Sequence, residues 1–105
     1  MKVIIERAAS FEMVAAAQYY DEEQPGLGSD FLDKVDAAVD EIAATPLRFG
    51  FYRGSKTIRS TRLGRFPYRL LFAVGSSRVS IVAVAHLHRH PDYWKHRLKD
   101  RKSVV

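Results

Sequence analysis

Cysteine is absent from the 105-residue sequence. A disulfide framework and a cysteine-ligated zinc site are therefore both excluded. Long hydrophobic runs are also missing, because the longest, LLFAVG and IVAVA, are far shorter than the ~20 residues that span a membrane. The opening MKVIIERAAS contains too short an apolar run for a signal peptide. Together these absences predict a cytoplasmic protein with no membrane partner.

Acidic side chains are nearly missing from the second half of the chain. Residues 57–105 contain 11 Lys and Arg but only 2 Asp and Glu, a net charge of +9. Residues 1–56 contain 6 basic and 10 acidic side chains, a net charge of −4. A basic half beside an acidic half suggests a polyanionic partner, either nucleic acid or an acidic protein, although solubility alone also fits.

The remaining composition is that of an ordinary globular domain. Hydrophobic residues make up 47% of the sequence and charged residues 28%. These values and the length predict one domain over residues 1–105, with a core that needs neither disulfides nor a cofactor.

Two helices are predicted in the first half, after a short β-branched strand at residues 2–6. Ser10 can cap the first helix, and QPGLGS, residues 24–29, breaks it. Ser29 can cap the second helix, which Thr45 and Pro46 end. One face of the first helix is expected to pack on the protein, and it consists of Phe11, Val14, Ala15, Gln18 and Tyr19. The apolar stripe of the second consists of Phe31, Leu32, Val35, Ala38, Val39 and Ile42.

Three strands are predicted after a loop at residues 47–56, where the hydrophobic period changes to two. They occupy residues 57–63, 68–74 and 79–88, and a tight turn at 75–78 joins the last two. The fold class is therefore α+β in the order β-α-α-β-β-β, with a short C-terminal segment. We expect two antiparallel helices on one face of a twisted antiparallel sheet, whose other face is open.

Turn positions give an expected register for the strands. A two-residue turn at Ser76-Ser77 places Arg69 opposite Val84, on the same face as His86 and His88. A turn at residues 64–65 adds Arg62 to that face, whereas a longer turn would place Arg59 there instead.

All four histidines lie in VAHLHRHPDYWKHR, residues 84–97. His86 and His88 point the same way on a strand, but zinc needs a third ligand and the nearby arginines repel a cation, so no metal is expected. His86 packed under Tyr93 or Trp94 is the structural interpretation. A third interpretation is RNA cleavage, in which Arg69 stabilises the phosphate and His88 moves a proton.

The order and the sequences of these segments resemble those of the RelE/ParE superfamily of toxins from bacterial toxin–antitoxin modules. The resemblance rests on YYDEEQPGLGSDFLDKVDAAVDEI, FPYRLLFAVGSSRVSIVAVAH and HRHPDYWKHR, which cover nearly the whole chain. It implies two N-terminal helices on a twisted antiparallel sheet, and growth inhibition that a cognate antitoxin silences. One branch of the superfamily cleaves mRNA in the ribosomal A site, and the other inhibits DNA gyrase.

The resemblance also assigns roles to particular residues. Nuclease members carry an arginine at the position of Arg69, and some carry a histidine at that of His88, usually followed by a tyrosine. Here Arg89 takes the place of that tyrosine. The ending HRHPDYW is more similar to the ParE-type and plasmid-stabilisation members.

The sequence therefore predicts a type II toxin that poisons DNA gyrase. The alternatives are a metal-independent, ribosome-dependent endoribonuclease (an mRNA interferase) using Arg69 and His88, or a relative without toxicity. The expected partners are gyrase or the ribosome with its mRNA and an antitoxin whose acidic segment folds on binding, and a homodimer is considered as well. The residues expected to bind a partner or nucleic acid are Lys56, Arg59, Arg62, Arg65, Arg69, His86, Arg89, Tyr93 and Trp94.

Overall fold

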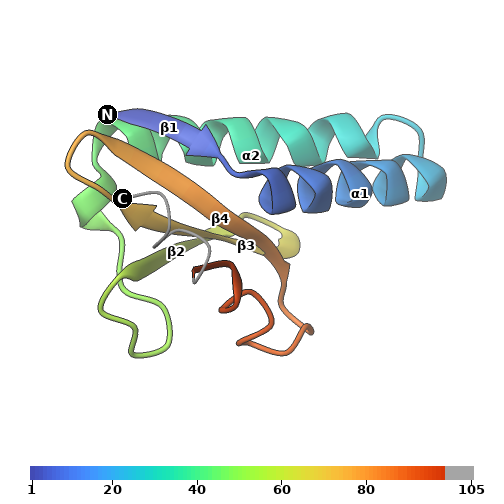
Figure 1. Ribbon diagram of the computed structural model, residues 1–105. Helices are drawn as coiled ribbons and strands as arrows, with labels where there is room; N and C mark the ends of the chain where they lie inside the picture. The colour runs from blue at the N-terminus through green and yellow to red at the C-terminus, as the bar shows by residue number, and fades with distance from the viewer. Residues whose placement is uncertain (99–105) are drawn as a thin grey trace.

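A computed structural model describes residues 1–98, so residues 99–105 of the single domain predicted over 1–105 lie outside the described part. The predicted order of elements is confirmed (Figure 1). The elements are β1 (Lys2–Ile5), α1 (Arg7–Glu23), α2 (Leu27–Ala44), the 3₁₀ helix η1 (Pro46–Arg48), β2 (Ile58–Leu63), β3 (Phe66–Val74) and β4 (Arg78–His86). Within residues 1–98, no helix is long and apolar enough to cross a membrane.

The four strands form one sheet in the order β1-β4-β3-β2. The expectation of a wholly antiparallel sheet is wrong for one pair, since β1 runs parallel to β4 while the other pairs are antiparallel. Parallel neighbours need a long crossover connection, and the two helices and the β2–β3 hairpin supply it. Local turn signals identify hairpins, but they contain no information about a pairing between strands so far apart in sequence.

The connection between the helices is shorter than expected. It consists of little more than Gln24 to Gly26, because α2 already begins at Leu27, and Gly26 rather than Ser29 is its N-cap. Gly26 has φ of +91°, which glycine adopts without strain. Gly28 serves packing instead of a turn, because a Cβ there would collide with the carbonyl oxygen of Ala17 on α1.

The face of α1 that packs on the protein is opposite to the predicted one. Phe11, Val14 and Tyr19 are 65%, 46% and 56% exposed, whereas Ala9 and Ala16 are buried. Helix α1 also starts earlier than expected, at Arg7, so Ser10 lies inside its first turns. The close approach of α1 to α2 and β4 requires small side chains at the contact, and this requirement outweighs hydrophobicity.

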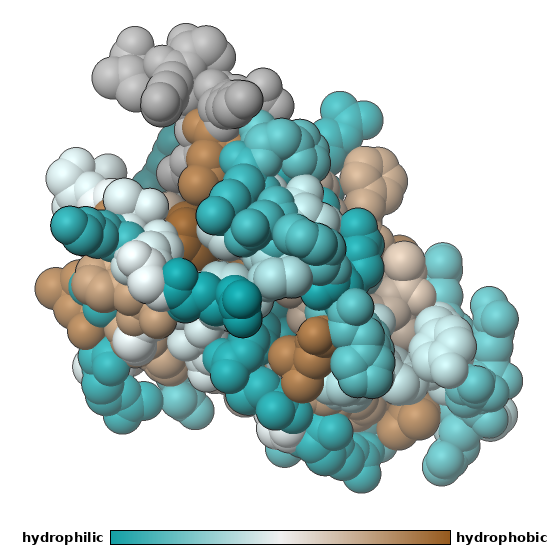
Figure 2. Space-filling view, turned by 90° about the horizontal axis from the view of Figure 1, so that it is seen from below, coloured by the Kyte–Doolittle hydropathy of each residue, from teal (hydrophilic) through white to brown (hydrophobic). Residues whose placement is uncertain are grey.

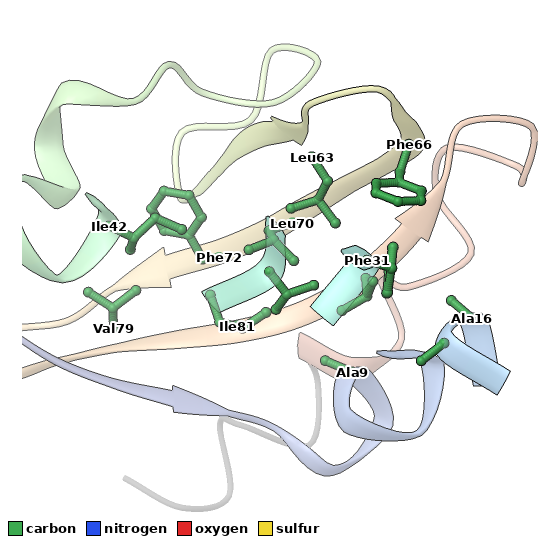
Figure 3. Packing of buried hydrophobic residues seen from close by; sticks show 13 residues of the cluster. Ala9, Ala16, Phe31, Ile42, Leu63, Phe66, Leu70, Phe72, Val79 and Ile81 are labelled. Carbon is green, nitrogen blue, oxygen red and sulfur yellow. The ribbon is translucent and has the colours of Figure 1, made fainter. Parts of the chain in front are cut away.

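The main core lies between the helices and the sheet. The predicted stripe of α2 is confirmed, with Phe31, Val35 and Ile42 buried. Figure 3 shows Ile42 beside Phe72 of β3 at one end of this cluster, with Phe31 and Phe66 toward the other end. The ring centroids of Phe31 and Phe66 lie 5.3 Å apart in an edge-to-face arrangement.

The prediction that the other face of the sheet is open is wrong. The segment after β4 turns back beneath the sheet, on the side away from the helices (Figure 1). Its Trp94 is 2% exposed and packs in a second cluster of buried residues with Ile58, Leu71, Val82, Ala83 and Ala85. Seen from below, this side presents mainly hydrophilic residues with scattered apolar ones (Figure 2).

Candidate partner-binding surface

A β-bulge changes which residues of β3 and β4 share a face. The hairpin begins in the predicted register, with Val74 opposite Val79, but the register shifts between Leu71 and Phe72. Beyond the shift Arg69 lies opposite Ala85, and Tyr68 lies opposite His86. The prediction that Arg69 and His86 share a face is therefore wrong, because one extra residue in a strand reverses every side chain beyond it.

Two arginines lie side by side on the face of the sheet turned away from the helices. Arg62 of β2 is directly opposite Arg69 of β3, so the prediction that the two share a face is confirmed, whereas the predicted register, with Ser60 opposite Arg69, is wrong. Arg69 is half-buried, and its Nη1 donates to Ser60 Oγ at 3.0 Å. Arg62 is exposed. Like charges directly across a pair of strands repel each other, and an anionic group bound between them would relieve the repulsion.

Two of the four histidines, His86 and His88, lie together on the other side of β3. The ring of His86 lies 4.9 Å from that of Tyr68 and 5.0 Å from that of His88, measured between centroids. Tyr68 itself packs against the helix-side core. Partial burial, with a smaller contribution from His88, lowers the pKa of His86. His86 meets both of these rings edge to face, and within residues 1–98 no three metal-ligating side chains gather at one place.

Two of the predicted partner-binding arginines are engaged within the protein. Arg59 Nη1 donates to the carbonyl oxygen of Phe49 at 2.6 Å, and its guanidinium lies 4.1 Å from the ring centroid of Phe51. It fastens the loop before β2. Arg65 Nη2 lies 3.3 Å from Asp30 Oδ2, which attaches the β2–β3 turn to α2. Lys56 is exposed in the loop, so it is available to a partner.

The aromatic residues of the C-terminal segment are also internal. Trp94 Nε1 donates to the carbonyl oxygen of Pro91 at 2.6 Å while its ring fills the second cluster. Tyr93 is half-buried, and the guanidinium of Arg89 lies 3.9 Å from its ring centroid. The prediction that His86 packs under Tyr93 or Trp94 is wrong, because its ring contacts Tyr68 and His88 instead.

One carboxylate, not identified from the sequence, holds the C-terminal segment in place. Glu12 of α1 accepts hydrogen bonds from Tyr93 Oη at 2.6 Å and from Arg97 Nη1 and Nη2 at 2.9 and 3.0 Å. The side chains of Glu12 and Arg97 are each only 16% exposed. Burial, followed by the hydrogen bond to Glu12, raises the pKa of Tyr93. In the sequence, Glu12 is the only acidic residue between Ala9 and Ala16, and this isolated charge could have identified it. It was missed because the opposite face of α1 was predicted to be buried.

The same pair closes the part of the β4 edge that β1 is too short to reach. The pairing of β1 with β4 ends at Ile81. Beyond it, Glu12 Oε1 accepts from the Val84 N–H at 3.0 Å, and Arg97 Nη1 donates to the Val82 carbonyl at 2.9 Å. Two side chains thus satisfy the backbone groups that a longer strand would have paired.

A shallow groove lies between α1 and the end of the sheet. It encloses about 250 Å³. The residues that line it include Tyr19, Tyr68, Val84, His86 and Arg89. The chain therefore offers two surfaces to a partner: the arginine pair Arg62 and Arg69 beneath the sheet, and this groove with Arg89 at its rim.

The fold has a counterpart among solved structures. A chain from the chromosomal ParDE TA (toxin–antitoxin) system from P. aeruginosa matches with a TM-score of 0.74 and 17% sequence identity, over 84% of this chain and 97% of that chain. The fold implied by the resemblance to the RelE/ParE superfamily is thereby confirmed. The sequence matches no protein-family model and no curated protein at a significant level.

Proposed function

We propose that this protein is the toxin of a type II toxin–antitoxin module and that it inhibits growth by binding and poisoning DNA gyrase. The observation that carries the proposal is the shared fold with a chain of the ParDE system over nearly the full length of that chain. The arginine pair beneath the sheet supports it, because two adjacent guanidinium groups suit an anionic surface.

The positions of Arg69 and the histidines favour a binder over a nuclease. RNA cleavage needs the phosphate-stabilising group and the proton-transferring group at one site. Arg69 lies on the face of Ser60, whereas the ring of His88 meets that of His86 edge to face, and His86 lies on the opposite face. Arg89, which follows His88, packs on Tyr93 and offers no acid or base for proton transfer.

Induction of the protein in bacterial cells tests the proposal. We expect growth arrest with a DNA-damage response while translation continues, measured with a damage reporter and by pulse labelling of new protein. Abrupt translation arrest with cut messages would contradict gyrase as the target. Normal growth despite abundant folded protein would contradict both toxin hypotheses and support the alternative of a relative without toxicity.

A ribosome-dependent, metal-independent endoribonuclease is the second candidate. The arginine pair favours it, because bidentate guanidinium groups bind phosphate oxygens well. In this alternative Arg69→Ala and His88→Ala each abolish message cleavage, at a cost of about 2.7–4 kcal/mol in the barrier for a lost phosphate donor. Arg78→Ala, an exposed arginine at the start of β4, is the matched control. Unchanged cleavage by folded Arg69→Ala protein would exclude this use of the residue.

The proposed antitoxin carries an acidic segment that folds on the toxin as it binds. Arg62, Arg69 and Arg89, with Lys56, remain for its carboxylates, while Arg59 is committed to backbone carbonyls. Charge should mainly speed association, whereas buried apolar contacts should set the lifetime. Stopped-flow mixing at several salt concentrations should then show an on-rate that falls more than the off-rate rises. An on-rate that does not depend on salt would contradict this mode of binding.

A further inference from the structure

Helix α1 presents a short apolar stripe to solvent, followed on the same face by the exposed Gln18. Phe11, Val14 and Ala15 are exposed on the side opposite to the buried Ala9 and Ala16. The α1–α2 hairpin projects beyond the end of the sheet, so this side of α1 is accessible (Figure 1). Scattered exposed apolar residues are ordinary, but a stripe at helical spacing on a free helix face is typical of a docking surface.

The charges at the two ends of the stripe are placed symmetrically. On the helical period, Arg7 and Glu22 lie on the same face as the stripe, and both are exposed. They are equally far, about 11 Å along the axis, from the point between Val14 and Ala15. A second, antiparallel copy of α1 crossing at that point would bring each Arg7 against the other copy's Glu22. Small residues would then meet at the centre, where two helices approach most closely.

The same charges do not suit the helix on which they lie. The first turn of α1 carries Arg7 and no acidic residue, while the last turn carries Glu22 and Glu23 and no basic residue. The helix dipole favours the reverse arrangement at both ends. The helix dipole therefore does not account for the positions of Arg7 and Glu22. Arg7 also contacts its own helix, because its guanidinium lies 5.8 Å from the ring centroid of Phe11. A self-complementary contact would place both charges against opposite ones.

We propose that α1 is a homodimer interface, in which the stripes of two copies of this chain pack antiparallel around a two-fold axis near Val14 and Ala15. The contact is isologous, since each residue meets its symmetric counterpart. One helix face buries less area than a standard stable interface, so the association is weak and depends on concentration. The inference stands whether or not the protein is a toxin, because it uses only the surface of α1.

Charge reversal in the full-length chain tests the pairing. Sedimentation equilibrium should show a dimer whose dissociation constant rises about tenfold in Arg7→Glu and in Glu22→Arg. The two-fold contact contains the Arg7–Glu22 pair twice, so each substitution creates two pairs of like charges. The double variant should return to within about threefold of the wild type, because the pairs are re-formed with opposite polarity. Both substitutions also suit the helix dipole, so loss of folding does not confuse the result.

A cross-link gives an independent measurement. Because the chain has no cysteine, Ala15→Cys introduces a single thiol near the proposed axis, and oxidation should link two copies. Asp36→Cys, on the exposed side of α2, is the matched control and should stay monomeric.

Three outcomes would overturn the proposal. The first is a protein that stays monomeric up to roughly 1 mM. The second is a dimer that the charge reversals leave unchanged or that the double variant does not restore. The third is a monomeric free protein whose binding to the antitoxin is lost in Phe11→Glu, which would assign the stripe to a helix of that partner.

Discussion

The two faces of the sheet are covered by different means. On the helix side, Phe31, Phe72 and Ile81 belong to a large apolar cluster in which these side chains are fully buried. On the other side a short segment without strand or long helix is held by Trp94 and by a single carboxylate, Glu12. The first layer depends on a large apolar area, and the second on a smaller apolar cluster around Trp94 together with a few directional contacts.

This difference separates stability from recognition. We expect the helix-side core to hold the fold even when the C-terminal segment is displaced. The lower side carries the arginine pair and the segment that Glu12 holds through Tyr93 and Arg97. We expect substitutions on the helix side to unfold the protein, and those on the lower side to alter local order and binding while the fold remains.

The largest effect should come from Phe72→Ala. Phe72 is fully buried, and its ring centroid lies 5.6 Å from that of Phe49. Removing the ring should lower the free energy of unfolding by about 3–5 kcal/mol through lost burial and the remaining cavity. Urea denaturation followed by far-UV circular dichroism measures it. A loss below about 1 kcal/mol would show that the helix side is not the dominant core.

Glu12→Gln should have a smaller effect that is mainly local. The amide keeps the shape of the side chain but loses the charge that binds Arg97, at a cost of about 1.5–3 kcal/mol. Trp94 is the only tryptophan, so its fluorescence reports on the segment specifically. We expect a red shift before the circular dichroism signal of the helices changes. Coincident transitions in the variant would contradict the separation of the two layers.

The accuracy of the sequence-based predictions follows the same division. The stripe from Phe31 to Ile42, the end of the helix at Thr45 and the hairpin turn after Val74 depend on local periodicity, and each is confirmed. The bulge after Leu71 has no local signature, and it moved His86 to the other face from Arg69.

Long-range contacts account for the remaining errors. The alanine face of α1 was misassigned because close helix packing selects size over hydrophobicity. Glu12 and Arg97 are 85 residues apart, and no spacing rule connects them. The placement of the C-terminal segment beneath the sheet depends on that contact, so it could not be predicted.

Arg62→Thr should change stability in the opposite direction. It removes the like charge facing Arg69 and places a β-branched residue on a strand, so thermal unfolding should show a gain of about 0.2–1 kcal/mol. Toxicity in cells should fall at the same time. A variant that loses stability would show that Arg62 packs favourably, and unchanged toxicity would remove it from the binding surface.

The smallest effect concerns His86 and pH. Burial lowers its pKa in the folded protein below the ordinary 6.5, so the unfolded chain binds a proton at higher pH than the folded one. The stability that this histidine contributes is present above pH 6.5 and is lost as the pH falls through the folded value. Thermal denaturation of wild type and His86→Gln should therefore diverge below pH 6.5, with His96→Gln as the exposed control. Parallel curves for His86→Gln and the wild type would contradict this.

The central claim is that the arginine pair beneath the sheet recognises the target. The most direct measurement is inhibition of DNA supercoiling by purified gyrase, with wild type, the Arg62→Ala/Arg69→Ala double variant and the Arg78→Ala control. We predict that wild type and control inhibit equally, while the folded double variant needs at least about tenfold more protein, the loss expected for about 1.4 kcal/mol of binding. Absence of inhibition by the wild type, or equal inhibition by the double variant, would contradict the account.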